Sequence, residues 1–141
     1  MPKRVYLDSN VLISALRDEM DRQFRFLSAE AQLFFSRVRK NRDTVVLSSL
    51  FYFEVKKCIK ISREEANEYF QSIGVTFEEA AFTEEHSLEE KRIALSGVHR
   101  PDSIHAAIAI KAGCDCIVSF NAKDFEKINR SINVIEPKDF I

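Results

Sequence analysis

The distribution of apolar residues along the 141-residue chain restricts its fold more than any other feature. Short, continuous apolar runs alternate with longer segments in which apolar residues recur every three or four positions. The first pattern is typical of strands in a parallel sheet covered on both faces, and the second of amphipathic helices. The sequence therefore predicts a three-layer α/β/α sandwich with a parallel sheet of about five strands, joined by right-handed crossovers. The strands are expected at 4–7, 44–48, 75–78, 116–120 and 132–136.

Helical patterns fill the segments between these runs. They cover residues 10–18, 21–40, 49–59, 63–73, 83–97 and 100–113. Gly97 and Gly113 stand where helix C-caps are expected, because glycine takes the left-handed conformation that ends many helices. No linker, repeat or low-complexity tract interrupts the chain, so residues 1–141 are expected to form a single domain.

The composition argues against several classes of protein. The net charge is −1, so there is no global basic field that attracts nucleic acid. The apolar runs are too short for a signal peptide or a membrane span, and we expect a soluble, cytoplasmic protein. Phosphate-binding glycine loops and the G-x-S-x-G motif are missing from the sequence. The three cysteines, Cys58, Cys114 and Cys116, are expected to be small core residues, the last two on one face of a strand.

Polar and acidic residues lie next to the predicted strands. Asp8 follows the first strand, Glu54 lies two turns into the helix after the second, and Asp102 is in the first turn of the helix before the fourth. Asn121 and Asp124 follow the fourth strand. Ligands of open parallel sheets bind beyond the carboxyl ends of the strands, so we expect these five side chains to converge there.

Glu54 is the hardest of these acids to explain as a surface residue. At helical spacing its neighbours Leu50, Phe51 and Cys58 are apolar, and only Lys57 is charged. A surface pair with Lys57 would contribute only about 0.3–0.5 kcal/mol. An unpaired carboxylate in apolar surroundings costs several times more. We therefore expect a positive group to face Glu54.

A divalent cation is the simplest such group. Two carboxylates about 4 Å apart repel each other by roughly 4 kcal/mol at an effective dielectric constant of 20. A set of oxygen ligands favours Mg²⁺ or Mn²⁺ over zinc. Structural roles stay open for single acids, as an Asx-turn at Asp8 or as helix N-termini at Asp102 and Asp124. His105, one turn after Asp102, either supports the site from behind the acids or is simply packed.

Three stretches, in order along essentially the whole chain, resemble the PIN domain, the fold of the VapC-type ribonuclease toxins of prokaryotic toxin–antitoxin pairs. They are VYLDSNVLISAL, LSSLFYFEV and RPDSIHAAIAIKAGCDCIVSFNAKDF. The resemblance implies Mg²⁺- or Mn²⁺-dependent hydrolysis of RNA phosphodiesters, by an endoribonuclease that is the toxin of a type II toxin–antitoxin pair.

The resemblance also implies roles for the acids. Asp8 and Asp102 would be direct metal ligands, and Glu54 a ligand or a base that orients water. Asp124 or Asn121 would support a more weakly held ion, with Asp124 among the catalytic acids. Many members of the family have an aspartate where this chain has Asn121, so the fourth ligand and a second metal site stay open.

Substrate contacts are expected beside these acids. Ser9, Asn10 and Ser119 neighbour them in the sequence, and Ser119 is expected to orient a water or a ligand. An acidic pocket repels RNA unless its rim is basic. The candidates for that rim are Arg17, residues 37–42, Lys56, Lys57, Arg100 and Lys123, of which Arg100 and Lys123 lie closest to the acids in sequence. Single-stranded RNA is favoured over duplex, because a reactive phosphate must enter a cleft.

Aromatic residues in the segment 24–35 fall on more than one side of its predicted helix, which suggests a surface covered by a partner. A homodimer is the first expectation and a small antitoxin the second. Two other functions stay open. One is a Mg²⁺-dependent phosphatase with Asp8 as nucleophile, and the other is a catalytically silent PIN-like adaptor that binds RNA or protein.

Overall fold

The computed structural model describes residues 2–17, 26–80, 100–128 and 131–141. Strands and helices alternate along the chain as the apolar pattern predicts. The strands are β1 (Arg4–Leu7), β2 (Thr44–Ser48), β3 (Thr76–Ala80), β4 (Cys116–Val118) and β5 (Asn133–Ile135). The helices are α1 (Ser9–Arg17), α2 (Leu27–Asn41), α3 (Ser49–Ile59), α4 (Arg63–Ser72) and α6 (Arg100–Lys111), with 3₁₀ turns η1 (Ala122–Ile128) and η2 (Pro137–Asp139). The predicted helix at 83–97, with Gly97, lies outside the described residues.

The five strands form one parallel sheet in the order β3-β2-β1-β4-β5. This confirms the predicted fold class. The fourth strand ends at Val118, two residues earlier than expected. Beyond Val118, the N–H of Ser119 still donates to the carbonyl of Ile135 at 3.0 Å, whereas the N–H of Phe120 donates to the amide oxygen of Asn10 at 3.2 Å.

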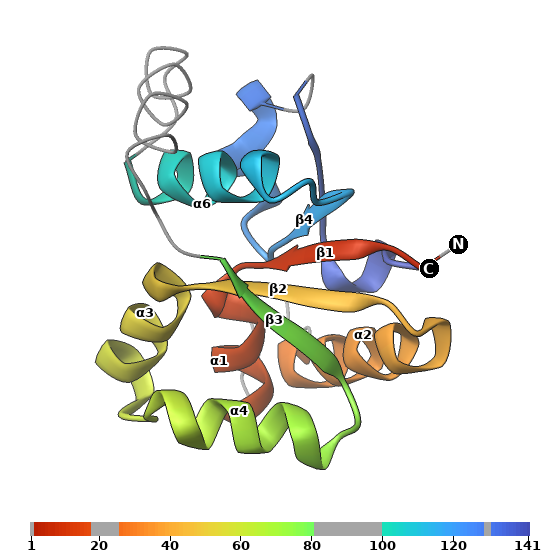
Figure 1. Ribbon diagram of the computed structural model, residues 1–141, viewed down its shortest axis with the longest axis vertical. Helices are drawn as coiled ribbons and strands as arrows, with labels where there is room; N and C mark the ends of the chain where they lie inside the picture. The colour runs from red at the N-terminus through yellow and green to blue at the C-terminus, as the bar shows by residue number, and fades with distance from the viewer. Residues whose placement is uncertain (1, 18–25, 81–99, 129–130) are drawn as a thin grey trace.

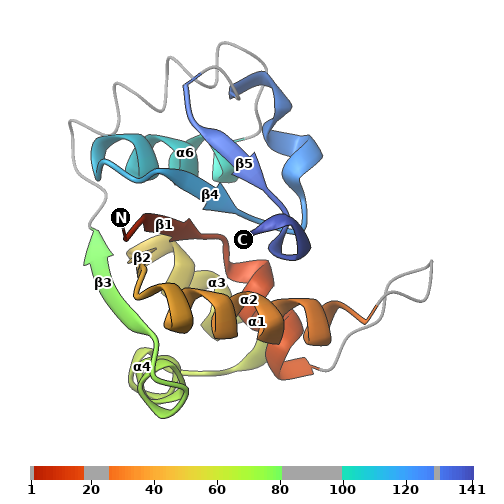
Figure 2. The same ribbon diagram turned by 90° about the vertical axis from the view of Figure 1, so that its right-hand side faces the viewer.

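Helices cover both faces of the sheet. Helices α1 to α4 lie on one side, and α6 with η1 lies on the other (Figures 1 and 2). Alternate strand residues face the two layers: Val5 and Leu7 belong to the core under α1–α4, whereas Tyr6 belongs to the core under α6. The three-layer sandwich follows from this division of the core. Among the described residues, no helix is both long enough and apolar enough to span a bilayer.

The strand order creates a switch point between β1 and β4. β2 and β3 lie on one side of β1 within the sheet, and β4 and β5 lie on its other side. The N–H of Asp8 donates to the carbonyl of Val118 at 3.1 Å, so the chain leaves β1 and β4 side by side. Such a point is where open parallel sheets place their ligand sites.

Two helices begin at the same carboxyl edge. Ser48 ends β2 and caps α3, since its hydroxyl accepts the N–H of Phe51 at 3.1 Å. This fixes Glu54 in the second turn of α3, close to the sheet. Helix α6 runs back toward the start of β4 and is followed by Gly113 at φ +70, as predicted for a C-cap. Its first turn, with Asp102, therefore lies at the carboxyl edge.

The cysteine predictions are partly wrong. Cys58 is exposed, because it lies near the open end of α3. Cys114 and Cys116 pack into different cores, because β4 begins only at Cys116 and the alternation of a strand does not yet apply at Cys114. Burial raises the pKa of Cys114 to about 12 and that of Cys116 to about 11, so both stay protonated thiols.

Candidate metal centre at the carboxyl edge of the sheet

Asp8 is the innermost acid of the site. Its side chain is almost buried, with a relative exposure of 7%. The hydroxyl of Ser119 donates to Oδ2 of Asp8 at 2.7 Å, and the hydroxyl of Ser9 lies 3.5 Å from Oδ1. The carboxylate therefore has a fixed orientation, which a metal ligand needs.

Glu54 points toward Asp8 rather than toward solvent. Its Oε1 accepts a hydrogen bond from the hydroxyl of Ser9 at 2.9 Å. Since Ser9 has a single hydroxyl proton, the shorter distance favours Glu54 over Asp8 as its acceptor. Glu54 is about a quarter exposed, so one side of its carboxylate remains open to the cleft.

The positive group that faces Glu54 is His105. Its Nε2 lies 2.8 Å from Oε1 of Glu54 and 3.9 Å from Oδ1 of Asp8. An ionised carboxylate can only accept, so Nε2 carries the proton. Nδ1 of the same ring contacts the hydroxyl of Tyr6, which lies 2.8 Å from the hydroxyl of Ser48. A buried chain of polar groups thus runs from Ser48 through Tyr6 and His105 to Glu54.

This chain shifts the pKa values of its members. Burial alone would raise the pKa of Glu54, but the hydrogen bond and charge of His105, with the hydroxyl of Ser9, lower it below the usual value. Burial alone would lower the pKa of His105, but the hydrogen bond of Glu54 and the charges of Asp8, Glu54 and Asp102 raise it. Burial raises the pKa of Tyr6 well above its usual range, so its hydroxyl stays protonated. The site therefore favours an ionised Glu54 beside a protonated imidazole.

The donor set fits a divalent cation. Asp8, Glu54 and His105 each offer one ligand atom, and these atoms lie within 4.8 Å of one another. The two carboxylates suit Mn²⁺ or Mg²⁺. His105 can join them as a ligand only when Nε2 has lost its proton, and otherwise it remains the hydrogen-bond partner of Glu54. The contact of Nδ1 with Tyr6 is the second hydrogen bond that metal-bound histidines usually make.

The other predicted ligands lie outside this three-residue cluster. Asp102 is half-buried in the first turn of α6, one turn before His105, and its charge contributes to the raised pKa of His105. Asp124 is exposed in η1. Asn121 is exposed, and its backbone N–H donates to the hydroxyl of Ser119 at 3.0 Å. All three remain predicted ligands.

Asn10 and Ser119 orient the acids. The amide of Asn10 donates to the hydroxyl of Ser119 at 3.2 Å, and that hydroxyl donates in turn to Asp8. The amide oxygen of Asn10 also accepts the backbone N–H of Phe120, so this side chain connects the start of α1 to the segment that follows β4. Their predicted role in substrate binding stays a prediction.

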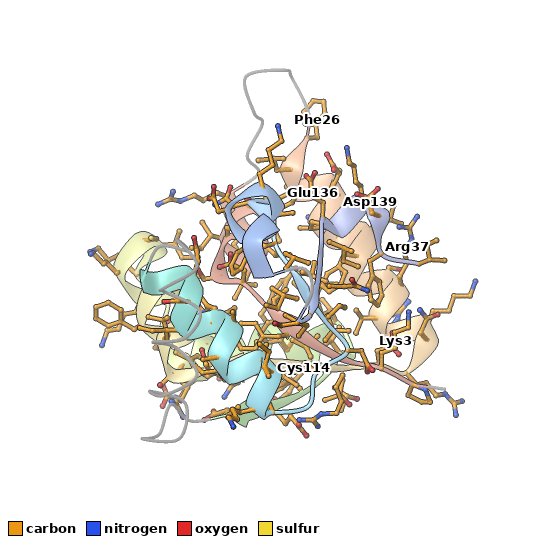
Figure 3. The ribbon with its side chains drawn as sticks, turned by 90° about the horizontal axis from the view of Figure 1, so that it is seen from above. Lys3, Phe26, Arg37, Cys114, Glu136 and Asp139 are labelled. Carbon is orange, nitrogen blue, oxygen red and sulfur yellow. The ribbon has the colours of Figure 1, made fainter. Side chains whose placement is uncertain are left out.

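The predicted basic rim is partly wrong. Residues 37–42 end α2 immediately before β2, so they lie at the amino edge of the sheet, opposite the acids. Arg37 donates there to the carbonyls of Lys138 and Phe140, and it lies beside η2 in Figure 3. The guanidinium of Arg17 contacts the carbonyl of Cys58, which ties α1 to the end of α3.

Lys57 and Lys123 remain candidates for the basic rim. Lys57 lines the cleft beside Glu54, and Lys123 is exposed in η1. The side chain of Arg100 lies outside the described part of the chain.

A cleft of about 490 Å³ opens beside the cluster. Its walls combine polar groups of the site with apolar side chains of α1, α3 and α6. They are Ser9, Asn10, Ile13, Leu50, Phe53, Glu54, Lys57, Cys58 and Ile104.

Sequence reasoning left His105 open between a supporting role in the site and simple packing, and it did not place Tyr6 or Ser48 in the site. A signal existed for His105, because it follows Asp102 by three residues and so shares its helix face. Tyr6 and Ser48 carry no such signal, since each reads as an ordinary member of a strand.

The chain matches the family model of the PIN domain over residues 5–131. It belongs to the PIN domain family. Among solved structures, a toxin–antitoxin complex from Klebsiella pneumoniae is similar with a TM-score of 0.66 at 18% identity, covering 94% of this chain and 97% of that one. VapBC2 from Rickettsia felis, bound to a promoter DNA fragment, has a TM-score of 0.65 at 18% identity, covering 94% and 98%. These likenesses show the fold.

DNA-bound VapBC from Salmonella typhimurium is similar to the same degree, with a TM-score of 0.65 at 19% identity, covering 97% of this chain and 99% of that chain. No curated protein matches the sequence.

Proposed function

We propose that this PIN-domain protein is a Mg²⁺- or Mn²⁺-dependent endoribonuclease and the toxin of a type II toxin–antitoxin pair. The observation that carries the proposal is the meeting of Asp8 and Glu54 with His105 at the switch point of the sheet, where their ligand atoms lie within 4.8 Å of one another. Membership of the PIN family and the likeness to toxin–antitoxin complexes support it.

Asp8 and Glu54 would hold the cation, with His105 as a third ligand or as their hydrogen-bond partner. When bound, the cation would supply Lewis acidity toward water and positive charge toward the phosphate. Ser119 holds the Asp8 carboxylate in place, and Ser9 does the same for Glu54. We assign Glu54 the role of orienting the attacking water, since its carboxylate lines the open cleft.

RNA would approach through the cleft beside Glu54. Lys57 lines this cleft and Lys123 lies nearby in sequence to the end of β4, so both are assigned to the phosphate backbone. A phosphate can reach the nearly buried Asp8 only if the strand enters the cleft, which favours single-stranded RNA.

A protein partner is part of the proposal. Phe26 and Leu33 are exposed and seven residues apart, two turns of helix, so they share one side of the α2 region. The ring of Phe26 points away from the body of the molecule (Figure 3). We assign this surface to a homodimer or to an antitoxin. Light scattering of wild type and Leu33→Glu tests it: a dimer that becomes a monomer supports a homodimer, and unchanged mass contradicts that assignment.

The direct test incubates the protein with a mixed RNA pool in Mn²⁺ or in EDTA. Asp8→Asn removes a ligand, and Asp139→Asn is the matched control. Asp139 is exposed in η2, next to Phe140, whose ring lies against Lys3 at the start of the sheet. Cleavage in Mn²⁺ by wild type and Asp139→Asn, but not by Asp8→Asn, is expected. Cleavage in EDTA, or an active Asp8→Asn, contradicts the proposal.

The same assay separates the two alternatives. Turnover of a small phosphate ester by wild type, without cleavage of RNA, points to a phosphatase that uses Asp8. Binding of the RNA pool without any turnover points to a silent adaptor.

A further inference from the structure

Phe53 is a large aromatic residue that the core does not use. Its relative exposure is 63%, whereas its neighbours Phe51 and Tyr52 are buried. It directly precedes Glu54 and lines the same cleft. An aromatic ring left in water beside a set of candidate catalytic groups is a candidate contact for a ligand.

The helix arranges this ring together with charged groups. Leu50 lies three residues before Phe53 and four before Glu54, and Lys57 lies four residues after Phe53 and three after Glu54. The four side chains therefore form one strip along α3. Lys57 lies one turn beyond Phe53, about 6 Å along the helix axis. The strip thus offers, in order, an apolar wall, an aromatic face, an acid of the metal cluster and a cation.

We propose that this part of the cleft is a nucleobase subsite, in which an unpaired base of the RNA strand stacks on Phe53. The phosphate next to that base reaches Asp8, Glu54 and His105, and Lys57 contacts the strand on the far side. The inference rests on the proposed ribonuclease function and deepens it, because it assigns the residue that selects for single-stranded substrate.

The size of the cleft fits a nucleotide. A volume of about 490 Å³ suits a small-molecule group. The cleft also contains Ser9, Asn10 and Glu54, so whatever fills it touches the groups that would act on the substrate.

The chemistry of the walls matches a base. Ile13, Leu50, Phe53 and Ile104 give apolar surface for its flat faces, and Ser9, Asn10 and Glu54 offer polar groups for its edges. Every base has a π-face, so stacking on Phe53 tolerates different sequences. A base inside a duplex has no free face, so the subsite excludes paired RNA.

Fluorescence gives a direct test, because the chain contains no tryptophan. Phe53→Trp introduces a single indole at the proposed subsite. Ile141→Trp is the matched control, since Ile141 is almost fully exposed next to Phe140, which lies against Lys3. The probes are a single-stranded RNA 12-mer of mixed sequence, its duplex, and an abasic 12-mer with the same backbone, each in Mg²⁺ and read before cleavage accumulates.

We expect the single strand to quench the Phe53→Trp variant at least about twofold, and the duplex, the abasic strand and the control variant to show little change. In the cleavage assay, Phe53→Ala should lower kcat/KM about tenfold, as for the loss of one stacked base, and Phe53→Tyr should restore it. Because Phe53 is exposed, neither change should alter the melting temperature.

Three results would overturn the inference. Equal quenching by the abasic strand would mean that the backbone alone is bound. Full activity of Phe53→Ala on RNA that wild type cleaves would leave the ribonuclease proposal standing and remove the subsite. A blue shift of the Phe53→Trp emission that grows with protein concentration, without RNA, would show that a second copy of the chain covers Phe53 instead.

Discussion

The acids at the two edges of the sheet have different partners. At the amino edge, the carboxylate of Asp43 accepts the N–H of Lys3 at 2.7 Å, and that of Asp115 accepts the N–H of Arg4 at 2.8 Å. At the carboxyl edge, Asp8 and Glu54 face each other and share one imidazole.

The difference separates acids that build the fold from acids that are available for chemistry. An acid that accepts a backbone N–H joins two segments of chain. Asp43 does so through Oδ1 alone, since its Oδ2 is buried without a hydrogen-bond partner among the described residues. Two acids that share a site repel each other, and the fold alone does not neutralise them. We therefore expect the acids at the carboxyl edge to bind a cation at some cost in folding stability. Substitutions at the two edges should then have different effects on activity and on stability.

Asp8→Asn should have the largest effect, and it should fall on activity alone. Loss of a ligand to a Lewis-acidic cation removes several kcal/mol of transition-state stabilisation, so cleavage of RNA should drop about 1,000-fold. In EDTA, the melting temperature should change little, because the repulsion between Asp8 and Glu54 is relieved while the attraction between Asp8 and His105 is lost. A lower melting temperature in EDTA would mean that Asp8 serves the fold as Asp43 does.

Asp43→Ala should lower the stability of the fold and leave the activity unchanged. Asp43 is only 2% exposed, and its loss leaves the N–H of Lys3 without that acceptor. We expect the free energy of unfolding to fall by about 1–3 kcal/mol. Urea denaturation measures this change, and the cleavage rate at a temperature where both proteins are folded should match wild type. A specific loss of activity would contradict the division between the edges.

Tyr6→Phe tests the connection between the core and the site. It keeps the ring but removes the hydroxyl that contacts His105 and Ser48. We expect about a tenfold loss of kcat, comparable to the loss of one buried hydrogen bond. Ring ¹⁵N shifts of His105 should change as well, because Nδ1 loses its partner. An unchanged His105 spectrum would show that Tyr6 does not position the imidazole.

Lys57→Ala should have the smallest effect. One exposed cation beside the cleft contributes one phosphate contact, so RNA binding should weaken only a few-fold. The slope of log affinity against log salt should flatten by about 0.7 for single-stranded RNA. Lys40→Ala, at the amino edge, is the matched control and should leave the slope as it is. Equal changes of the salt slope in both variants would indicate that RNA binds to basic side chains in general and not at the cleft.

Periodicity was sufficient to predict the sheet, because β1, β2 and β4 each contain a buried, continuous apolar run and each helix has its own repeat. The edge strand β3 carries Glu78 and Glu79 and has the weakest apolar signal. It also singled out Glu54, since an acid among apolar helical neighbours needs a positively charged partner. The partner itself was not predictable. His105 reaches Glu54 only because α6 returns to the carboxyl edge, and that distance depends on how helices pack rather than on sequence spacing.

The predicted basic rim also shows what the sequence could not determine. Residues 37–42 carry four basic side chains in a row of six, which suggests a nucleic-acid contact when seen alone. Their position just before β2 puts them at the amino edge, and Arg37 is used there to hold η2. Charge can be counted in a sequence, but the edge on which it falls depends on the topology.

Titration of Mn²⁺ into the metal-free protein, followed by calorimetry, tests the central claim most directly. We expect wild type and Asp43→Ala to bind Mn²⁺ and Asp8→Asn to lose most of that binding. Saturation at about 100 times Kd should stabilise wild type by about 2.7 kcal/mol. Binding that is equally strong in Asp8→Asn, or no binding to wild type, would contradict a metal centre at the carboxyl edge.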